Sequence, residues 1–201
     1  MNLHEPTTLI TDYILCIAAL VFAARLWRVF RPWSLAFLFT ALGSLFGGTY
    51  HGFLHVLTPF AAETIWKATV FSIGLASFFL LLGTAHALTT LAVVKLIVYT
   101  SWMITHDDFL WVMLDYGATM LIIGAVQIVA WVRERAPSAP WVIGSIVVAI
   151  AGALVQASAL TLHRQFNHND LYHVIQLVAL WLLYRGGLRM SSTSRPSSRP
   201  T

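Results

Sequence analysis

The sequence predicts an all-α integral membrane protein, a bundle of seven transmembrane helices with an outside N-terminus and a cytoplasmic C-terminus. Composition is the first observation behind this prediction: 58% of the 201 residues are hydrophobic and 10% are charged, whereas a soluble domain has about 25% charged residues. The second is a series of seven apolar stretches, each near the roughly 20 residues that cross a bilayer. The third is a one-sided distribution of arginine, which orients membrane proteins.

Charged residues, prolines and glycines separate the apolar stretches and set their limits. The predicted spans are 9–28, 34–57, 63–83, 87–105, 109–132, 140–162 and 169–187. The last residues are rich in Ser, Pro and Arg and contain no aromatic side chain, a composition typical of disorder. The sequence therefore predicts a transmembrane domain over 1–189 and a disordered cytoplasmic tail over 190–201.

The arginines predict which end of the bundle is cytoplasmic. With the N-terminus outside, nine basic residues fall on the inner loops and the tail and two fall at the outer ends, which is the bias expected of the cytoplasmic side. The inner residues are Arg25, Arg28, Arg31, Arg133, Arg135, Arg185, Arg189, Arg195 and Arg199, and the outer ones are Lys67 and Arg164. No Lys or Arg precedes the first apolar stretch, so we expect it to be a helix and not a cleaved signal peptide.

Two other classes of interpretation are excluded by the charges and by the cysteine count. The net charge of +4 comes from residues spread over separate loops and the tail. Nucleic acid is therefore not an expected partner, because no basic face with interleaved aromatic residues is present. The one cysteine, Cys16, lies inside the first span and cannot form an intrachain disulfide.

The histidines and carboxylates gather at the outer end of the predicted bundle. Asp12, His51, Glu63, Asp115 and His173 all lie inside otherwise apolar spans near this end. A charged side chain in the hydrocarbon region costs about 3 kcal/mol on insertion scales, so such residues are usually functional. The sequence therefore predicts a polar site in the outer third of the membrane.

Histidine spacing makes this site a candidate metal centre. His51 and His55 are four residues apart, share one helix face and could bind one ion. His168 and His173 are five apart, about 140° around a helix of 3.6 residues per turn. Three interpretations stay open: His168 binds from a turn before the helix, Asp170 binds in its place, or His168 only supports the ligands. We favour His51, His168 and His173 as zinc ligands, because neutral imidazole is a common ligand of zinc.

Glu63 is the candidate catalytic carboxylate, since it begins the third span just after the loop that follows His51. Lys67 lies one turn further on the same face and could keep Glu63 ionised; the alternative is an ordinary Glu–Lys pair at a helix start. Asp115 is a second candidate carboxylate. A hydroxyl that stabilises an oxyanion could come from Ser44, or from Thr49 or Tyr50, which are nearer to His51. Residues expected to support the ligands are Asp12, His55, Lys67, Asn169 and Asp170.

Two stretches of the sequence resemble a known group of membrane enzymes. GGTYHGFLH in the second span and NDLYHVIQLVALW in the seventh are similar to motifs of the CREST superfamily of seven-helix hydrolases, which includes alkaline ceramidases and progestin and adipoQ receptors. The resemblance implies that His51 and His173 bind zinc. Gly47 stands where the pattern has Ser, Asn169 stands where it has the first His of the seventh helix, and Glu63 replaces an Asp.

The resemblance also implies a function. We expect a zinc-dependent intramembrane hydrolase that cleaves an amide or ester bond of a ceramide-like or other acylated lipid. Short loops suggest a multi-pass protein of a bacterial inner membrane, with its site on the periplasmic side. Two alternatives are a receptor or sensor with a structural metal, and a bis-histidine haem or ion-handling protein in which Asp115 and Lys67 relay protons. The sequence does not predict an oligomeric state.

Overall fold

Seven α-helices make up most of the molecule in the computed structural model, which describes residues 3–161, 163 and 166–193. They are α1 (Pro6–Leu26), α2 (Arg31–Phe53), α3 (Pro59–Thr84), α4 (Thr89–Met103), α5 (Phe109–Glu134), α6 (Ala139–Ala157) and α7 (His168–Thr193), with short 3-10 helices η1 (Leu54–Val56) and η2 (His86–Leu88). The described part contains no β-strand, so the predicted all-α class is confirmed.

The helix starts follow from local chemistry. α1, α2, α3 and α6 each have a proline in the first turn, where its fixed φ suits a helix and its missing N–H is not needed. Two starts are capped by side chains: Ala61 donates its N–H to Thr58 Oγ1, and Leu110 donates to Asp108 Oδ1. The end of α5 is marked by Arg135, which has the left-handed φ of 50° typical of a helix terminus.

Several predicted limits were wrong by a few residues. α2 ends at Phe53 and not at 57, and α6 ends at Ala157 and not at 162. α7 continues to Thr193, so the first four residues of the predicted tail, 190–193, are helical; no proline or glycine lies between Leu188 and Arg195 in the sequence. The predicted tail residues 194–201, and the basic residues Arg164, Arg195 and Arg199, lie outside the described residues.

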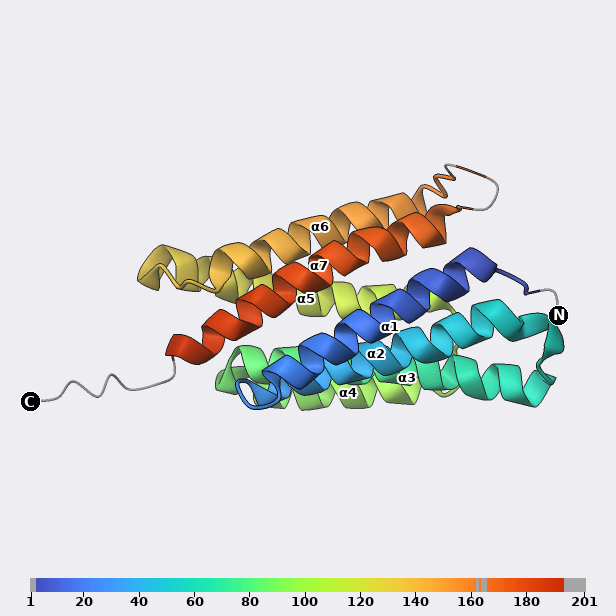
Figure 1. Ribbon diagram of the computed structural model, residues 1–201. Helices are drawn as coiled ribbons and strands as arrows, with labels where there is room; N and C mark the ends of the chain where they lie inside the picture. Colours follow the sequence, from blue (N-terminus) through green and yellow to red (C-terminus); the bar gives the residue numbers. More distant parts are fainter. Residues whose placement is uncertain (1–2, 162, 164–165, 194–201) are drawn as a thin grey trace, which may run out of the picture.

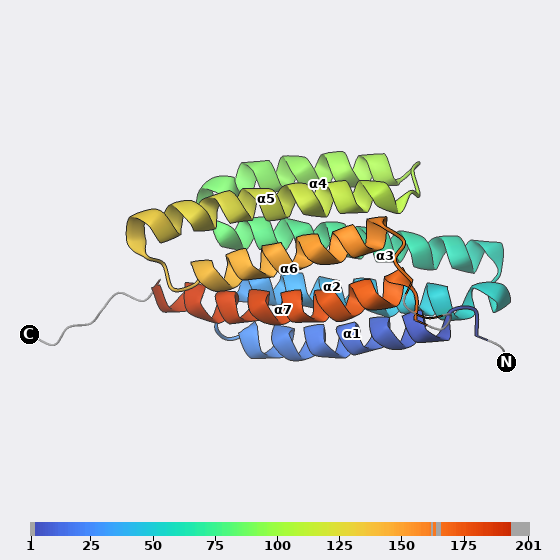
Figure 2. The ribbon, with the colours of Figure 1, turned by 90° about the horizontal axis from the view of Figure 1, so that it is seen from above.

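Six helices form a closed ring and the seventh lies outside it. The principal contacts join α1 to α2, α2 to α3, α3 to α5, α5 to α6, α6 to α7 and α7 back to α1. α4 packs mainly on α3, and Figure 2 shows it at the edge of the bundle. α1 begins and α7 ends at opposite ends of the bundle (Figure 1), as an odd number of antiparallel helices requires.

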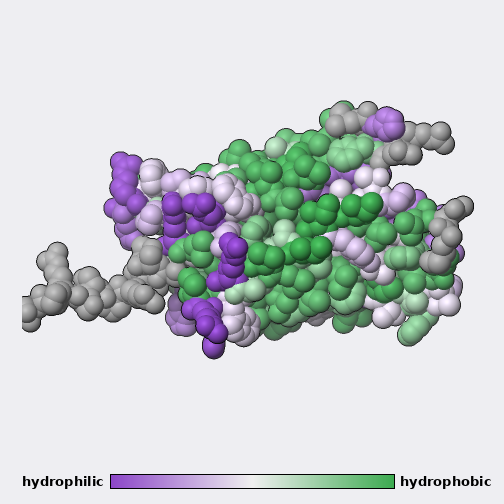
Figure 3. Space-filling model, in the orientation of Figure 1, coloured by the Kyte–Doolittle hydropathy of each residue, from purple (hydrophilic) through white to green (hydrophobic). Residues whose placement is uncertain are grey.

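The outer surface of the bundle suits a lipid environment. Six helical segments of the described chain are long and apolar enough to cross a membrane, with η2 and α4 counted together as His86–Met103. The exception is α2, which carries four glycines that lower its mean hydropathy. Figure 3 shows a largely hydrophobic face, with hydrophilic residues gathered toward the end where α7 finishes.

That hydrophilic end is where arginines stack on tryptophans. Arg31 lies over Trp27, Arg135 over Trp131, and Arg185 over Trp141. Tryptophan rings are typical of the membrane–water interface, and arginine of its cytoplasmic side. We call this the arginine end, and the opposite end, where α1 and α7 begin, the site end.

Candidate functional site

A cavity of about 510 Å³ lies inside the ring of six helices, within the range of small-molecule sites. All six ring helices line it, and among the described residues none comes from α4. Most of its lining is apolar, from side chains such as Leu15, Ile73 and Met120. Its principal polar groups come from Asp12, His51, Gln156, Asn169 and His173, which lie toward the site end.

Close packing of α1 on α2 brings Asp12 into this cavity. A Cβ at Gly48 would lie 2.8 Å from Asp12 Cβ and 3.0 Å from the Tyr13 ring, so only glycine allows this approach. Asp12 is 6% exposed, although an ionised carboxylate is rarely buried without a partner. Its partner is His173 of α7, whose Nε2 lies 3.5 Å from Asp12 Oδ1.

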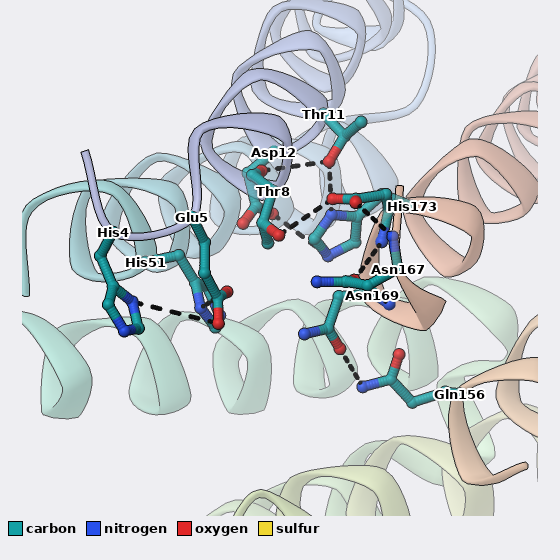
Figure 4. A network of polar contacts seen from close by, with 11 residues as sticks. His4, Glu5, Thr8, Thr11, Asp12, His51, Gln156, Asn167, Asn169 and His173 are labelled. Atoms are coloured by element: carbon teal, nitrogen blue, oxygen red, sulfur yellow. Dashed lines mark hydrogen bonds and ion pairs between the residues drawn. The ribbon is translucent and has the colours of Figure 1, made fainter. Parts of the chain in front are cut away.

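His173 has polar neighbours on both of its ring nitrogens (Figure 4). Thr11 Oγ1 lies 2.9 Å from His173 Nδ1 and 3.1 Å from the carbonyl oxygen of Thr8. A Thr11 hydroxyl that donates to Thr8 accepts from Nδ1–H of His173, which leaves a lone pair on Nε2 of the neutral ring; a hydroxyl that donates to Nδ1 leaves the proton on Nε2.

His51 is held in a similar way by the N-terminal leader, residues 3–5. His51 Nδ1 lies 2.9 Å from Glu5 Oε2, and this buried oxygen has no regular hydrogen bond among the described residues. The leader is fixed by backbone bonds from His4 N to Gly52 O and from Glu5 N to His51 O. Glu5 therefore lies beside Nδ1 of His51, while His51 itself lines the cavity.

At the start of α7, Asp170, one of the predicted alternative ligands, has a structural role. Asn167 Oδ1 accepts from the backbone N–H groups of Asn169 and Asp170, while Asp170 Oδ2 accepts from Asn167 N at 2.8 Å. This is a reciprocal capping arrangement. Thr8 of α1 donates to Asp170 Oδ1 at 2.9 Å, so fully buried Asp170 joins α1 to α7 and does not line the cavity.

His168 and Asn169 also differ from their expected roles. His168 is the first residue of α7 and is absent from the described cavity lining, so the predicted trio of His51, His168 and His173 is not brought together. Asn169 does line the cavity, and its Oδ1 accepts a hydrogen bond from Gln156 Nε2 at 2.7 Å.

The structure does not bring Glu63 to the cavity. Glu63 is exposed at the start of α3 and is not part of the described lining. Lys67 is directed away from it: Nζ pairs with Asp107 and donates to the carbonyl oxygen of Met103 at 2.7 Å. These contacts fasten the loop between α4 and α5 onto α3, because a helix C-terminus offers unpaired carbonyls that a lysine can satisfy.

Asp12 is therefore the carboxylate to test, and Glu63 is its matched control. Asp12→Asn is expected to abolish any activity of the cavity, whereas Glu63→Gln should leave activity within about twofold of wild type, as usual for an exposed substitution. Turnover by the two purified variants, each checked for folding, measures this difference. Equal losses in both variants would restore Glu63 as a candidate.

The remaining predicted residues divide between the cavity and other contacts. Ser44 lines the cavity on α2, and its role as an oxyanion-stabilising hydroxyl stays a prediction. His55 lies outside it, with its ring packed edge-on against His4 at 4.2 Å between centroids. Asp115 of α5 pairs with Lys95 of α4 and is absent from the described lining.

Sequence reasoning missed Glu5, Thr8 and Thr11, which position the two histidines and α7. Glu5, Thr8 and Asp12 recur at spacings of three and four, which places them on one side of α1. This polar stripe on an apolar helix was the signal that could have identified α1 as the helix that organises the site.

The donor chemistry of this site suits a metal ion, although the described residues contain no ready-made group of three ligands. Two imidazole Nε2 atoms and a carboxylate are typical zinc donors. In both rings Nδ1 lies 2.9 Å from an oxygen, Glu5 Oε2 for His51 and Thr11 Oγ1 for His173, and ligand histidines in metal sites commonly have such a partner. These candidate donors come from three helices, α1, α2 and α7.

Comparison with known proteins identifies a family without assigning an activity. A family model described as a family of unknown function (DUF6962) matches residues 7–192, and the chain therefore belongs to this family. No significant match was found among curated proteins or among solved structures.

Proposed function

We propose that this DUF6962 protein is a metal-dependent membrane hydrolase that cleaves an amide or ester bond of an acylated lipid. All seven helices would cross the membrane, with the arginine end in the cytoplasm and the site end on the opposite, extracytoplasmic side. In a bacterial inner membrane that side is the periplasm. The apolar ring surface and the arginine–tryptophan contacts support this orientation.

One observation carries the proposal: His173 Nε2 and Asp12 Oδ1 face each other at 3.5 Å inside the cavity, and the second imidazole of the lining, His51, borders the same space. A cation held by these groups would offset the cost of burying the Asp12 carboxylate. Zinc is the cation that best suits two imidazoles and a carboxylate.

His51 and His173 would hold the ion through Nε2, with Asp12 alongside. When bound there, zinc would supply Lewis-acid activation of water and of a carbonyl oxygen. Asp12 is the one carboxylate in the described cavity lining, so it is the group that accepts the proton of the attacking water. It then returns that proton to the leaving nitrogen or oxygen, which completes the hydrolysis.

The rest of the cavity matches an acylated substrate. Ser44 on α2 lines it, and its hydroxyl can donate to the carbonyl oxygen as negative charge develops there. The apolar lining below, from residues such as Ile73 and Met120, suits an acyl chain. Purified protein loaded with zinc should therefore hydrolyse a ceramide-like amide or a matching ester, assayed by release of the fatty acid.

Loss of the side chains next to the Nδ1 atoms of His51 and His173 is expected to weaken metal binding without removing a ligand. Glu5→Ala and Thr11→Val should each lower zinc affinity about 10–100-fold, as such partners do in other metal sites. Titration with zinc and a competing chelator measures this directly. Thr64→Val is the matched control for Thr11→Val, because Thr64 is exposed on α3 and donates only to its own helix; equal affinities of Thr11→Val and wild type would contradict the role of Thr11.

A non-catalytic receptor is the second candidate, and Asn169 is the observation that favours it. Asn169 occupies the place of an expected histidine, and its oxygen accepts from Gln156. A site with two histidines can hold a structural ion or an imidazolium–carboxylate pair without catalysis. Protein that binds zinc stoichiometrically yet releases no fatty acid from either amide or ester substrates would support the receptor.

A further inference from the structure

The cavity opens sideways between α5 and α6. Several residues line the cavity and are also exposed on the outside of the bundle: Met113 and Leu121 of α5, 36% and 67% exposed, and Ile150 of α6, 49% exposed. A side chain that contacts both spaces lies at an opening between them. These residues fall in the half of α5 and α6 nearer the site end.

Gly117 of α5 lies beside this opening and has no side chain to fill it. It lines the cavity one turn from Met113 and one turn from Leu121. A Cβ placed on Gly117 would meet nothing within 4 Å, so close packing does not explain this glycine. The absence of a side chain leaves free space along α5 between the cavity and the exterior.

The chemistry of the opening identifies what passes through it. Its edges are apolar, it lies on the flank of the bundle, and α5 and α6 are both apolar enough to cross a membrane. An acyl chain that moves from lipid into an apolar cavity exchanges one hydrocarbon environment for another, whereas a polar ligand would first have to cross the hydrocarbon region.

We infer that one acyl chain of a membrane lipid enters the cavity sideways between α5 and α6, past Gly117. The reactive carbonyl would then lie toward Asp12 and His173, with the chain among Ile73, Met120 and Leu121. This inference depends on the membrane placement proposed above and does not depend on hydrolysis.

The test follows the chain itself by photo-crosslinking. A long-chain fatty acid with a diazirine in the middle of its chain is added to the full-length protein in phospholipid nanodiscs, and adducts are mapped by mass spectrometry. Adducts are expected on Met120 and Thr69, which are 6% and 4% exposed and line the cavity. Lipid-facing Val98, 63% exposed on α4, reports labelling from the surrounding bilayer.

Two pairs of variants then locate the path. Gly117→Phe should remove the adducts on Met120 and Thr69, whereas Gly144→Phe, at a glycine of α6 outside the described lining with only Leu182 Cδ1 near its Cβ at 3.9 Å, should retain them. Ile150→Trp and Val147→Trp form the second pair, because both residues are exposed on α6 and only Ile150 lines the cavity.

Each outcome separates access from chemistry. His173→Ala should keep the cavity adducts while losing hydrolysis, so failure of the proposed hydrolase leaves the path intact. Cavity adducts that persist in both Gly117→Phe and Ile150→Trp would overturn the path between α5 and α6. Labelling of Val98 without any cavity adduct in the wild-type protein would overturn the entrance of an acyl chain altogether.

Discussion

His173→Ala is expected to remove both the bound metal ion and the lipid hydrolase activity. His173 is one of two imidazoles in the cavity lining, and its Nε2 faces Asp12 at 3.5 Å. Loss of a supporting partner costs about 10–100-fold in metal affinity, and loss of a ligand should exceed this. Elemental analysis of purified wild type beside His173→Ala, combined with turnover of an amide substrate, measures both effects.

Controls for this experiment come from the other histidines. His51→Ala should reproduce the loss, because the same ion would lose its second imidazole. His86→Ala should retain both metal and activity, since His86 is exposed near the arginine end and lies outside the described cavity lining. Unchanged metal content in both His51→Ala and His173→Ala, with folded protein confirmed by thermal melting, would refute the metal centre.

The second large effect concerns stability and the pair formed by Lys95 and Asp115. These side chains, 16% and 9% exposed, bridge α4 and α5 within the predicted membrane spans. Lys95 also donates to Ser77 Oγ of α3 at 2.9 Å, and Ser77 shares a 2.6 Å hydrogen bond with Thr119. Lys95→Leu or Asp115→Leu alone should lower the free energy of unfolding by about 3–5 kcal/mol, because one buried charge is left without its partner.

The double variant distinguishes a structural pair from a catalytic one. Lys95→Met with Asp115→Leu removes both charges and should recover most of the lost stability. It should also retain turnover, because Asp115 contacts Lys95 and does not line the described cavity. Denaturation in detergent and the double-mutant cycle provide the energies. Single variants as stable as wild type would show that the pair contributes nothing, and inactivity of the stable double variant would restore Asp115 as a catalytic residue.

The pair also explains how α4 is attached outside the ring. Only Ala92, Tyr99 and Met103 of α4 are buried, and van der Waals packing is the main apolar force between helices in lipid. The Tyr99 hydroxyl donates to Val70 O at 2.8 Å, and Gly74 leaves room for the Tyr99 ring. Polar contacts thus supplement the small packing surface of α4.

The candidate site shows which inferences sequence spacing supports. His51 and His173 were predicted as ligands from separate helices, and both line the cavity. His168 was assigned through its closeness to His173 in the sequence, but five residues around a helix point a side chain elsewhere. Glu63 was chosen because it follows the His51 loop, and it lies on the exposed side of α3.

Asp12 was expected only to support the histidines because its partner lies 161 residues away. Nothing local links the sequence around Asp12 to that around His173, and their meeting requires α1 to close the ring against α7. The close approach allowed by Gly48 completes this contact on the α2 side.

By itself, the sequence determined the helical class, the approximate limits of the seven helices and the concentration of histidines at one end. These properties depend on residues near one another in the chain. They are the length of each hydrophobic stretch, the helix breakers between stretches and the loops in which arginine falls. Only the tertiary structure decided which polar groups meet, since each contact of the cavity joins different helices. It brought Asp12 and not Glu63 to the cavity, made Asp170 a helix cap, paired Asp115 with Lys95, and placed exposed residues of the cavity lining on α5 and α6. The physical reason is that spacing along a helix fixes the face a side chain occupies, whereas the neighbour of that face is fixed by how the whole bundle packs.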